Sequence, residues 1–453
     1  MTEGLFPQAF IKREQSHLGA AWVAFVKAHQ QPPPVSIRYN PSKWSPANML
    51  TPVPWASHAT YLRDRPSFTL DPTFHAGAYY VQEASSMFLE QAFKQTVSSN
   101  SQLNVLDLCA APGGKSTHLL NLLAPDSLLV SNDAIRSRAS ILSENIQKWG
   151  HNNVVVTNND PADFQRLPGF FDVIVVDAPC SGEGLFRKDP GAMKEWSEEN
   201  VLLCSKRQRR ILADVWPSLK SGGILIYSTC TYNEFENEEN IAWLHEQNGI
   251  ESISLRIQDD WNIDSHSRNG IHGYRFFPHR VKGEGFFMTV VRKTEAQSIM
   301  RLSGKSKFLG PAKKIKERLS DWVLKPDQKT FILRNDSIQC FPTEKMAAIE
   351  TLVQSLHVVT AGTYLAMVKH EKLIPEHALA VSIELNRSAF NASDLEKEDA
   401  LQFLRKENFL FPLGEKGFSL VTYQNIPLGW VNVLDNRINN LYPSEWRIRM
   451  GKS

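Results

Sequence analysis

Two cysteines stand directly after short apolar runs, at positions where a thiol can act as a nucleophile. Cys180 follows the run Val-Ile-Val-Val and the motif Asp177-Ala-Pro, and Cys230 follows the run Ile-Leu-Ile-Tyr and the pair Ser-Thr. A single cysteine in a core is usually buried and inert. Two thiols at one edge of a predicted sheet, beside the carboxyl group of Asp177, instead favour covalent chemistry, because a thiolate attacks electron-poor carbon and a carboxylate stabilises charge on a ring.

A loop of small residues precedes a helical pattern earlier in the chain. It follows Asp107 and consists of Cys109, Ala110, Ala111, Pro112, Gly113, Gly114 and Lys115. Small residues let a backbone approach a ligand closely, and a helix N-terminus offers free amides to an anion such as a carboxylate. The loop matches neither the dinucleotide motif nor the Walker motif, which would need glycine at position 109. By shape alone it is either a ligand loop or a packing turn.

Acidic residues follow the next apolar runs and favour the ligand interpretation. Asp133 ends the second run and Asp160 follows the third. An acid after the second strand of such a sheet can accept the hydroxyl groups of a ribose, and Asp160 could face an adenine amino group. Either aspartate could instead be a solvated loop residue. The repetition of an acid after successive strands is what points to a nucleoside ligand.

The elements that must position these residues alternate between strands and helices. Strand patterns cover 104–110, 127–133, 153–158, 171–179 and 223–230, and helical patterns cover 115–124, 138–149 and 200–219. This alternation predicts an α/β fold, with a parallel sheet and helices on both faces. Ligands of such sheets bind at the carboxyl ends of the strands, where the cysteines and aspartates fall.

Length and composition limit the class of protein. A chain of 453 residues is expected to form two or three domains, and 42% hydrophobic with 22% charged residues is ordinary for a globular protein. No run approaches a membrane helix and the N-terminus lacks a signal-peptide pattern, so we expect no membrane partner. Five cysteines without a C-x-x-C pair favour a reducing cytoplasm and predict no metal site. The net charge of +2 neither requires nor excludes a nucleic-acid partner.

Composition divides the chain into four predicted parts. A mixed segment rich in proline and tryptophan precedes the α/β region, a lysine-rich stretch around 294–315 follows it, and short strand patterns with glycine turns end the chain. The expected domains are 1–95, 96–295, 296–385 and 386–453.

Three motifs taken together resemble those of one enzyme family. DLCAAPGGK (107–115), DAPCSGEG (177–184) and STCTYNEFENE (228–238) resemble the motifs of the Nol/Nop/Sun family of RNA cytosine-5 methyltransferases, in particular its RsmF-like ribosomal RNA branch. The resemblance extends to FHAGAYYVQEASSM (74–87), YRFFPHRVKGEGFF (274–287) and the C-terminal GWVNVLDNRINNLYPSEWRI (429–448). These segments span most of the chain.

The resemblance implies a fold and a reaction. The fold would be a Rossmann-like S-adenosylmethionine-dependent methyltransferase sheet with an N-terminal RNA-binding domain and a C-terminal PUA-like β-rich module. The reaction would methylate carbon-5 of a cytosine in RNA, with small-subunit (16S) ribosomal RNA as the expected substrate. Carbon-5 is a poor nucleophile until a thiolate adds to carbon-6, which makes carbon-5 resemble an enamine.

The resemblance also gives roles to individual residues. Cys230 would be the nucleophile, Cys180 would assist release, and Asp177 would contact both the cytosine ring and the cofactor. The loop from Cys109 to Lys115, with Asp133 and Asp160, would bind S-adenosylmethionine.

Basic residues near the cysteine loops are candidates for RNA contact. Arg187 and Lys188 directly follow the Cys180 loop and are expected to hold the phosphates of a flipped strand. Weaker candidates are Arg38, Lys206, Arg207, Arg209, Arg210, Arg275 and Arg280. The expected partner is ribosomal RNA or a small ribosomal subunit, and the sequence indicates no obligate protein partner, so a monomer is expected.

Four alternatives remain at this point. The same chemistry could act on transfer RNA or large-subunit RNA. A catalytically silent assembly factor would have no need of two thiols and a cofactor loop. DNA enzymes place the nucleophile in the proline–cysteine motif, which would make Cys180 the attacking thiol. An amino-methylating enzyme would carry Asn/Asp-Pro-Pro-Tyr/Phe where Asp177-Ala-Pro-Cys180 stands.

Overall fold

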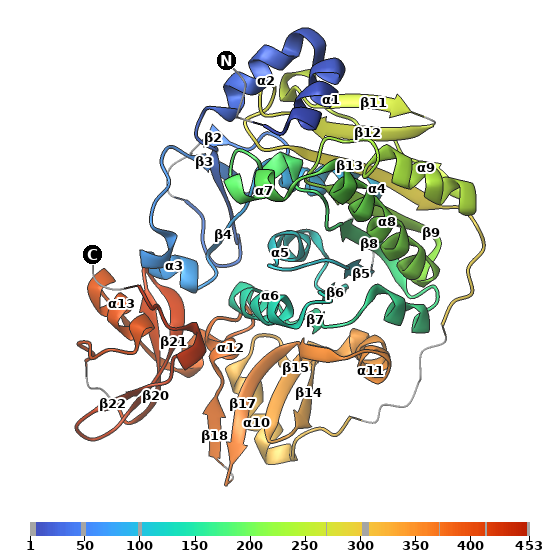
Figure 1. The fold of residues 1–453 in the computed structure, drawn as a ribbon. Coiled ribbons are helices and arrows are strands. Elements are labelled where there is room, and N and C mark those ends of the chain that lie inside the picture. The colour runs from blue at the N-terminus through green and yellow to red at the C-terminus, as the bar shows by residue number, and fades with distance from the viewer. Residues whose placement is uncertain are drawn as a thin grey trace.

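The predicted parallel sheet forms the centre of the molecule. The computed structural model describes residues 6–46, 51–97, 102–268, 270–300, 308–370, 372–412 and 415–450. Ten of the strands in these ranges form one sheet in the order β11-β12-β13-β9-β8-β5-β6-β7-β16, with β10 beside β13 (Figure 1). Strands β5 to β9 are mutually parallel, and antiparallel strands extend both edges. The strand bounds are β5 (Asn104–Asp107), β6 (Leu128–Asn132), β7 (Val154–Thr157), β8 (Phe171–Asp177), β9 (Leu219–Thr229), β10 (Ile250–Ser252), β11 (Asp264–Arg268), β12 (Ile271–Phe276), β13 (Phe286–Lys293) and β16 (Val358–Ala361).

Each buried strand sends alternate side chains into two different cores. Leu129 of β6 belongs to the core that packs against α4, α5 and α6, whereas Leu128 belongs to the core that packs against α8, α9 and α11. Because both faces are covered, the strands are apolar throughout, as their near-continuous hydrophobic runs predicted. The helix bounds are α4 (Leu89–Thr96), α5 (Gly114–Leu122), α6 (Arg136–Trp149), α7 (Pro190–Glu195), α8 (Glu198–Val215), α9 (Glu238–Gln247) and α11 (Met346–Ser355).

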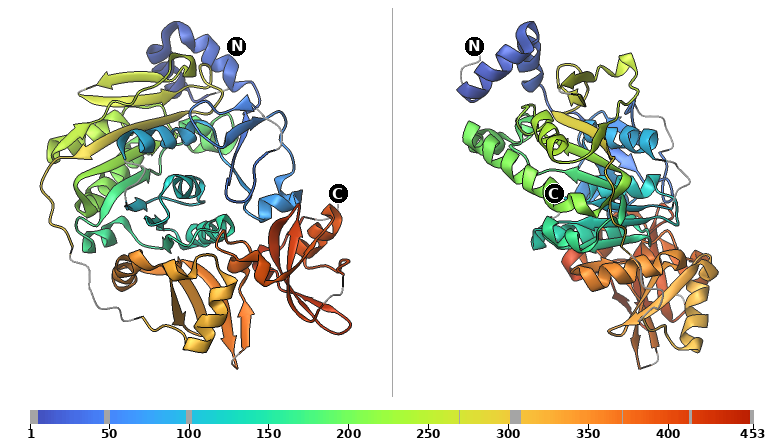
Figure 2. Two further views of the ribbon diagram at one scale, coloured as in Figure 1. Left: turned by 180° about the vertical axis from the view of Figure 1, so that it is seen from behind. Right: turned by 90° about the vertical axis from the view of Figure 1, so that its right-hand side faces the viewer.

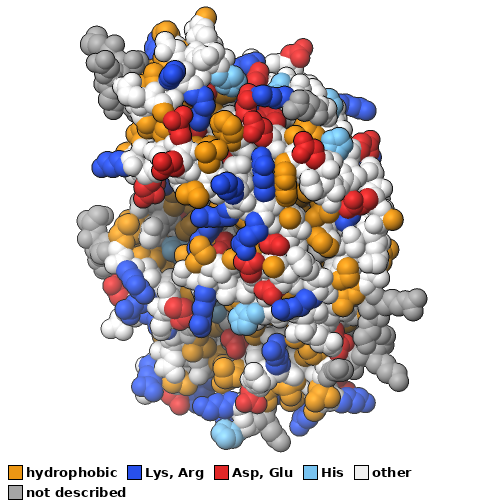
Figure 3. Space-filling view, turned by 45° about the vertical axis from the view of Figure 1, so that its right-hand side comes forward, with side chains coloured by type: hydrophobic (Ala, Val, Ile, Leu, Met, Phe, Trp, Pro, Cys, Tyr) orange, Lys and Arg blue, Asp and Glu red, His pale blue; other side chains and the backbone are white. Residues whose placement is uncertain are grey.

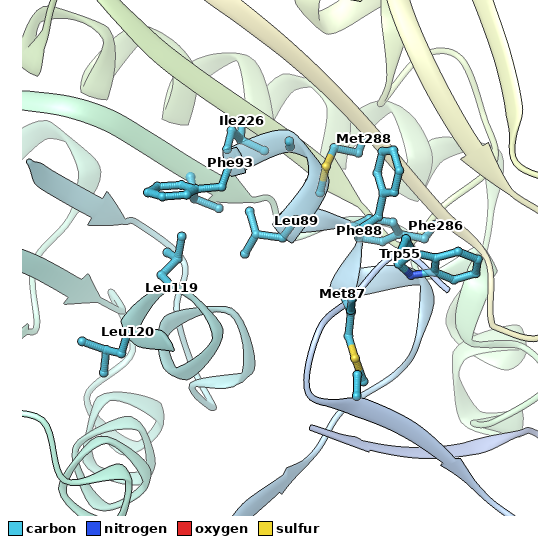
Figure 4. Close-up of a cluster of buried hydrophobic side chains, with 14 of the residues drawn as sticks. Trp55, Met87, Phe88, Leu89, Phe93, Leu119, Leu120, Ile226, Phe286 and Met288 are labelled. Carbon is cyan, nitrogen blue, oxygen red and sulfur yellow. The ribbon is translucent and has the colours of Figure 1, made fainter. Parts of the chain in front are cut away.

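The N-terminal part packs against the sheet and against the loops at its carboxyl edge. Four strands form a small sheet in the order β2-β3-β1-β4, and Figure 4 shows Trp55 beside Phe88 and Phe286 in the core shared with β13. Helices α1 and α2 lie at the end of the molecule away from the C-terminal module (Figure 2). The bounds are α1 (Gln8–Leu18), α2 (Trp22–His29), β1 (Val35–Tyr39), β2 (Thr51–Pro52), β3 (Ala59–Leu62), α3 (Pro72–His75) and β4 (Tyr79–Val81).

The connecting segment does not form an isolated domain. Its strand β16 extends the central sheet by pairing antiparallel with β7, Val358 opposite Thr157. The other strands form a separate sheet in the order β14-β15-β17-β18. Part of the predicted lysine-rich linker, residues 301–307, lies outside the described residues. The bounds are α10 (Lys313–Trp322), β14 (Lys329–Arg334), β15 (Ser337–Pro342), β17 (Thr363–Lys369), β18 (Lys372–Pro375) and α12 (His377–Ala380).

The C-terminal module contains the short strands that its turn pattern predicted. It shares one core with the connecting segment, where Trp430 packs with Leu365, and another with the N-terminal part, where Val431 packs with Ala76. Figure 1 shows the module beside α3, so the C-terminal module packs against the N-terminal part of the chain. The bounds are β19 (Asn391–Asp394), α13 (Lys397–Arg405), β20 (Gly417–Tyr423), β21 (Ile426–Val433) and β22 (Ile438–Asn440). In the described part of the chain, no helix combines the length and the apolar character needed to span a membrane.

Candidate active site

The two predicted cysteines meet at the carboxyl edge of the sheet. Strands β8 and β9 are parallel neighbours, and Asp177 at the end of β8 is paired with Ser228 of β9. The loops that follow therefore start side by side, and Cys180 Sγ lies 2.9 Å from Cys230 Sγ. Both residues are free cysteines of intermediate exposure. A substrate that reaches this edge can contact both thiols at once.

The environment of Cys180 favours its protonated form. Its hydrogen-bonding contact with Cys230, followed by burial, raises the pKa of the Cys180 thiol well above its ordinary value. The backbone N–H of Cys230 also points at Cys180 Sγ, at 3.3 Å. A thiol that keeps its proton is a weak nucleophile but can donate that proton or a hydrogen bond to a neighbouring thiolate.

Asp177 lies between the cysteine loops and the cofactor loop. Ser228 Oγ donates a hydrogen bond of 2.8 Å to Asp177 Oδ1, and Lys115 Nζ lies 2.7 Å from Asp177 Oδ2. The carboxylate side chain remains 37% exposed, so it is held in place without being closed off from a ligand. Lys115 was expected within the cofactor loop; here its ammonium group links that loop to Asp177.

The small-residue loop lines a cavity together with the N-terminal part. Gly113, with a φ of 116°, adopts the left-handed conformation that lets the chain turn into α5. The cavity of about 160 Å³ is bounded by Cys109, Ala110, Ala111, Pro112, Gly114, Lys115 and Asp177, and by Tyr80, Val81, Gln82, Glu83 and Ser86. Sequence reasoning missed the β4 contribution to this wall, although the motif that contains Tyr80 had been singled out.

Asp107 begins the DLCAAPGGK motif, but no role in the site was predicted for it. It is fully buried at the end of β5, with Ser116 Oγ donating to its Oδ2 at 2.6 Å. Its Oδ1 is buried and has no hydrogen-bond partner among the described residues. An unpartnered carboxylate oxygen beside a ligand loop fits an ammonium group, such as the one that S-adenosylmethionine carries. The sequence signal that could have identified Asp107 is its position as an acid at the carboxyl end of the first strand.

Asp133 and Asp160 stand at successive strand ends but in different surroundings. Asp133 is 3% exposed and accepts a hydrogen bond of 2.9 Å from the amide of Ile135. The Asp160 side chain is 46% exposed, pairs with Arg210 at 3.3 Å and accepts from the amide of Ala162. Asp133 also pairs with Arg138 at 3.4 Å, so the two aspartates differ in burial and not in having an arginine partner. The enclosed position of Asp133 just after β6 suits a ribose, whereas Asp160 is half exposed and caps a 3-10 helix.

Several predicted RNA contacts are engaged inside the protein instead. The Arg187 side chain is 6% exposed, and its guanidinium pairs with Glu284 at 2.9 Å and donates to the carbonyl of Gly283 at 2.7 Å. Arg38 and Arg275 are also buried. In this arrangement these three have no free face for a phosphate. Lys188 is exposed. Figure 3 shows basic and acidic side chains intermixed over one face, with several Lys and Arg side chains together near its middle.

The described residues contain no cluster of three or more His, Cys, Asp or Glu side chains that could hold a metal ion. The polar groups at this edge of the sheet include two thiols, the Asp177 and Asp107 carboxyl groups and the loop amides.

Comparison with known proteins places the chain in a family. Family models match residues 95–292 (16S rRNA methyltransferase RsmB/F), 6–84 (N-terminal domain of 16S rRNA methyltransferase RsmF) and 390–448 (methyltransferase RsmF PUA domain). The ribosomal RNA small subunit methyltransferase F of Salmonella agona is 32% identical, covering 99% of this chain and 97% of the relative. The chain belongs to the RsmF family of 16S ribosomal RNA methyltransferases. The predicted family and fold class are thus confirmed.

Other members of the RsmF family and solved structures agree. The Vibrio parahaemolyticus protein of the same name is 31% identical, covering 97% of each chain. A methyltransferase homologue from Pyrococcus horikoshii is 26% identical with a TM-score of 0.54, covering 64% of this chain and 95% of that one. A structure titled NSun6 from the same organism is 20% identical, covers 64% of this chain and 99% of that one, and has a TM-score of 0.54, which shows a shared fold.

The buried Asp107 carboxyl group should make cofactor binding depend on pH. Burial raises the pKa of Asp107 to about 7, so the group is neutral well below that pH and ionised above it. Only the ionised form attracts an ammonium group, so we expect the affinity for S-adenosylmethionine to rise between about pH 6 and about pH 8. Isothermal titration calorimetry across this range measures the change.

A matched pair of variants tests the role of Asp107. Asp107→Asn cannot gain a charge, so its weaker binding should not vary with pH. Asp172→Asn, at the opposite end of β8 where the carboxylate pairs with Lys220 at 2.6 Å, should keep the wild-type profile. If Asp107→Asn shows the wild-type profile, the carboxyl group does not meet the ammonium group.

Proposed function

We propose that this chain methylates carbon-5 of a cytosine in small-subunit ribosomal RNA, with S-adenosylmethionine as methyl donor and a covalent bond between Cys230 and the base. The observation that carries the proposal is the 2.9 Å approach of the Cys180 and Cys230 sulfurs, next to a carboxylate, Asp177, that also lines the cofactor cavity. A silent RNA-binding factor has no use for this arrangement. Membership of the RsmF family supports the ribosomal substrate.

The residues act in a defined order. The Cys230 thiolate adds to carbon-6 of a cytosine that has left its stack, and the electron pair of the 5,6 double bond moves to carbon-5. Asp177 contacts the ring nitrogen and the amino group and stabilises the charge on the adduct. When bound, S-adenosylmethionine supplies the methyl group that carbon-5 takes. A base then removes the carbon-5 proton, the double bond re-forms, and the carbon–sulfur bond breaks to return the Cys230 thiolate.

The state of the second thiol supports the division of roles. The contact with Cys230 and burial raise the pKa of Cys180, which suits a thiol that keeps its proton beside the Cys230 thiolate and assists when the adduct decomposes.

Single substitutions of the two thiols should differ in kind. Cys230→Ala should lose methylation and form no covalent RNA adduct. Cys180→Ala should still attack and transfer the methyl group but release the product poorly, so that a protein–RNA adduct survives denaturing gel electrophoresis. Incubation with S-adenosylmethionine and small-subunit ribosomal RNA, followed by such a gel and by mapping of 5-methylcytosine, measures both effects.

Cys204→Ala is the control, because Cys204 is a buried thiol of α8 outside the two cysteine loops and should behave as wild type. An adduct in Cys230→Ala with none in Cys180→Ala would reverse the roles. Methylation that survives in both variants would exclude the covalent mechanism.

A basic groove beside the cysteine loops is the proposed path of the RNA strand. It encloses about 1040 Å³, and its lining includes the exposed residues Arg63, Arg65 and Lys282 with a single acid, Asp64. Lys282 Nζ lies 4.4 Å from the centre of the Tyr61 ring. Three exposed cations that line one groove suit a phosphate backbone.

One loop connects the lining of the groove with the cysteine loops. Gly283 lines the groove, and Gly285, two residues later, packs so closely on Gly184 that a Cβ there would lie 2.6 Å from its Cα. The amide of Gly184 in turn donates to the carbonyl of Cys230 at 2.9 Å. This connection supports a path on which a strand in the groove reaches the thiols.

Removal of the groove cations should weaken RNA binding in a salt-dependent manner. The triple variant Arg63→Ala/Arg65→Ala/Lys282→Ala should bind a cytidine-rich single-stranded RNA more weakly, with a log–log salt slope smaller by about 0.7 per lost phosphate contact. Fluorescence anisotropy at several salt concentrations measures the slope.

The triple variant Lys313→Ala/Lys316→Ala/Arg318→Ala removes the same charge from exposed positions of α10 and should leave the slope unchanged. Equal slopes in the two triple variants would place the RNA elsewhere. Arg187→Ala is expected instead to destabilise the fold, since it leaves Glu284 buried and unpaired, a loss of roughly 3–5 kcal/mol for such pairs.

A further inference from the structure

Two buried carboxylates connect the cysteine loops to each other in both directions. Glu183 lies three residues after Cys180 and hydrogen-bonds to the loop after Cys230, whereas Glu236 lies six residues after Cys230 and hydrogen-bonds to the loop after Cys180. Both glutamates are 0% exposed. We call this pair of carboxylates the crossed brace. Neither residue entered the predicted site.

Glu183 binds the backbone of the Cys230 loop through one oxygen. Its Oε2 accepts from the amides of Tyr232 at 3.0 Å and Asn233 at 3.1 Å. Its Oε1 accepts from Arg13 Nη2 at 2.7 Å and Trp196 Nε1 at 2.9 Å. Arg13 belongs to α1, so the N-terminal helix supplies the positive charge that pairs with this carboxylate.

Glu236 makes the reciprocal connection. Its Oε2 accepts from the amide of Ser181 at 2.9 Å and from Gln208 Nε2 at 2.8 Å. The Asn233 side chain lies between the two carboxylates, with Nδ2 at 2.7 Å from Glu236 Oε1 and at 3.2 Å from Glu183 Oε1. Each carboxylate therefore accepts hydrogen bonds from several N–H groups. The carboxylate on the Cys180 loop binds amides of the Cys230 loop, and the carboxylate on the Cys230 loop binds an amide of the Cys180 loop.

We propose that Glu183 and Glu236 are positioning residues that fix the relative placement of the Cys180 and Cys230 thiols during methyl transfer, with Arg13 of the N-terminal helix holding Glu183. The proposal rests on the proposed function of the two thiols. Neither glutamate touches the reacting atoms; both act through the backbone of the loops that carry the thiols. The N-terminal helix pair thereby takes part in catalysis as well as in packing.

The brace suits carboxylates better than amides. A glutamate offers only acceptors, and every group around Glu183 and Glu236 is a donor. A glutamine side chain would place its NH₂ group against one of these N–H donors. Two donors repel each other, so one of the loops would have to move away. A shift of about 1 Å at reacting groups can slow a reaction by about 100-fold.

The test compares three glutamate-to-glutamine variants. Glu183→Gln and Glu236→Gln each break the brace. Glu238→Gln is the matched control: Glu238 is 2% exposed and lies two residues from Glu236, but it pairs with Arg275 at 2.6 Å and not with the cysteine loops. The single-turnover rate of adduct formation is measured on RNA that contains 5-fluorocytidine. In this nucleotide fluorine replaces the carbon-5 proton that must be removed for release, so the adduct persists. S-adenosylmethionine affinity and thermal midpoints are measured in parallel.

We expect adduct formation to be about 100-fold slower than wild type in Glu183→Gln and Glu236→Gln, with unchanged S-adenosylmethionine affinity. In Glu238→Gln the rate should stay within about threefold of wild type, even if the thermal midpoint of this variant falls as much as those of the other two. Arg13→Ala keeps the hydrogen bonds between the two loops but removes the cation that pairs with Glu183. It should slow adduct formation less than Glu183→Gln, and it provides the test if Glu183→Gln does not fold. Rates in the brace variants equal to the rate of Glu238→Gln overturn the proposal. An adduct in Cys230→Ala would instead overturn the proposed function.

Discussion

The parallel pairing of β8 with β9 sets the geometry on which the site depends. Neighbouring strands lie about 4.8 Å apart, so residues that leave two paired strand ends start within reach of each other. The register that places Asp177 opposite Ser228 gives the loops of Cys180 and Cys230 a common origin. Strand β5, which carries the cofactor loop, lies on the other side of β8. The small-residue loop, the Asp177 carboxylate and the Cys230 thiol, to which the proposed mechanism gives the methyl donor, the ring contact and the attack, thus follow three adjacent strands.

The parts outside the sheet contribute to this edge as well. Helices α1 and α2 bury Phe10 and Phe25 against Phe186 and Tyr232, which follow the two cysteines, and β4 supplies one wall of the cofactor cavity. The N-terminal part therefore supports the catalytic loops directly, in addition to forming one wall of the basic groove. The connecting segment and the C-terminal module reach the sheet from its far edge through β16 and through shared cores.

Local sequence patterns predicted the strands and helices well because these elements depend mainly on residues that are close together in the chain. Period-two and continuous apolar runs identified the five parallel strands, and helical spacing identified α5, α6 and α8. The same patterns could not distinguish a buried arginine from an exposed one. Arg187 follows a cysteine loop as a phosphate contact would, but its partner Glu284 is 97 residues away in the chain. Arg38 is likewise bound by Gln82 and Thr117, which no local pattern connects with it.

The sequence by itself determined which residue types stand at the strand ends: two thiols, a series of acids and a loop of small residues. Strand ends are set by neighbouring residues, so that information is local. Only the tertiary structure decided that the two sulfurs lie 2.9 Å apart, that Lys115 pairs with Asp177, and that Glu183 and Glu236 hold each other's loops. These facts depend on which donors and acceptors become buried together, and Glu183 and Tyr232 are 49 residues apart in the chain. Burial removes water as an alternative partner, so every such donor must find an acceptor within the packed loops, and packing alone determines which acceptor it finds.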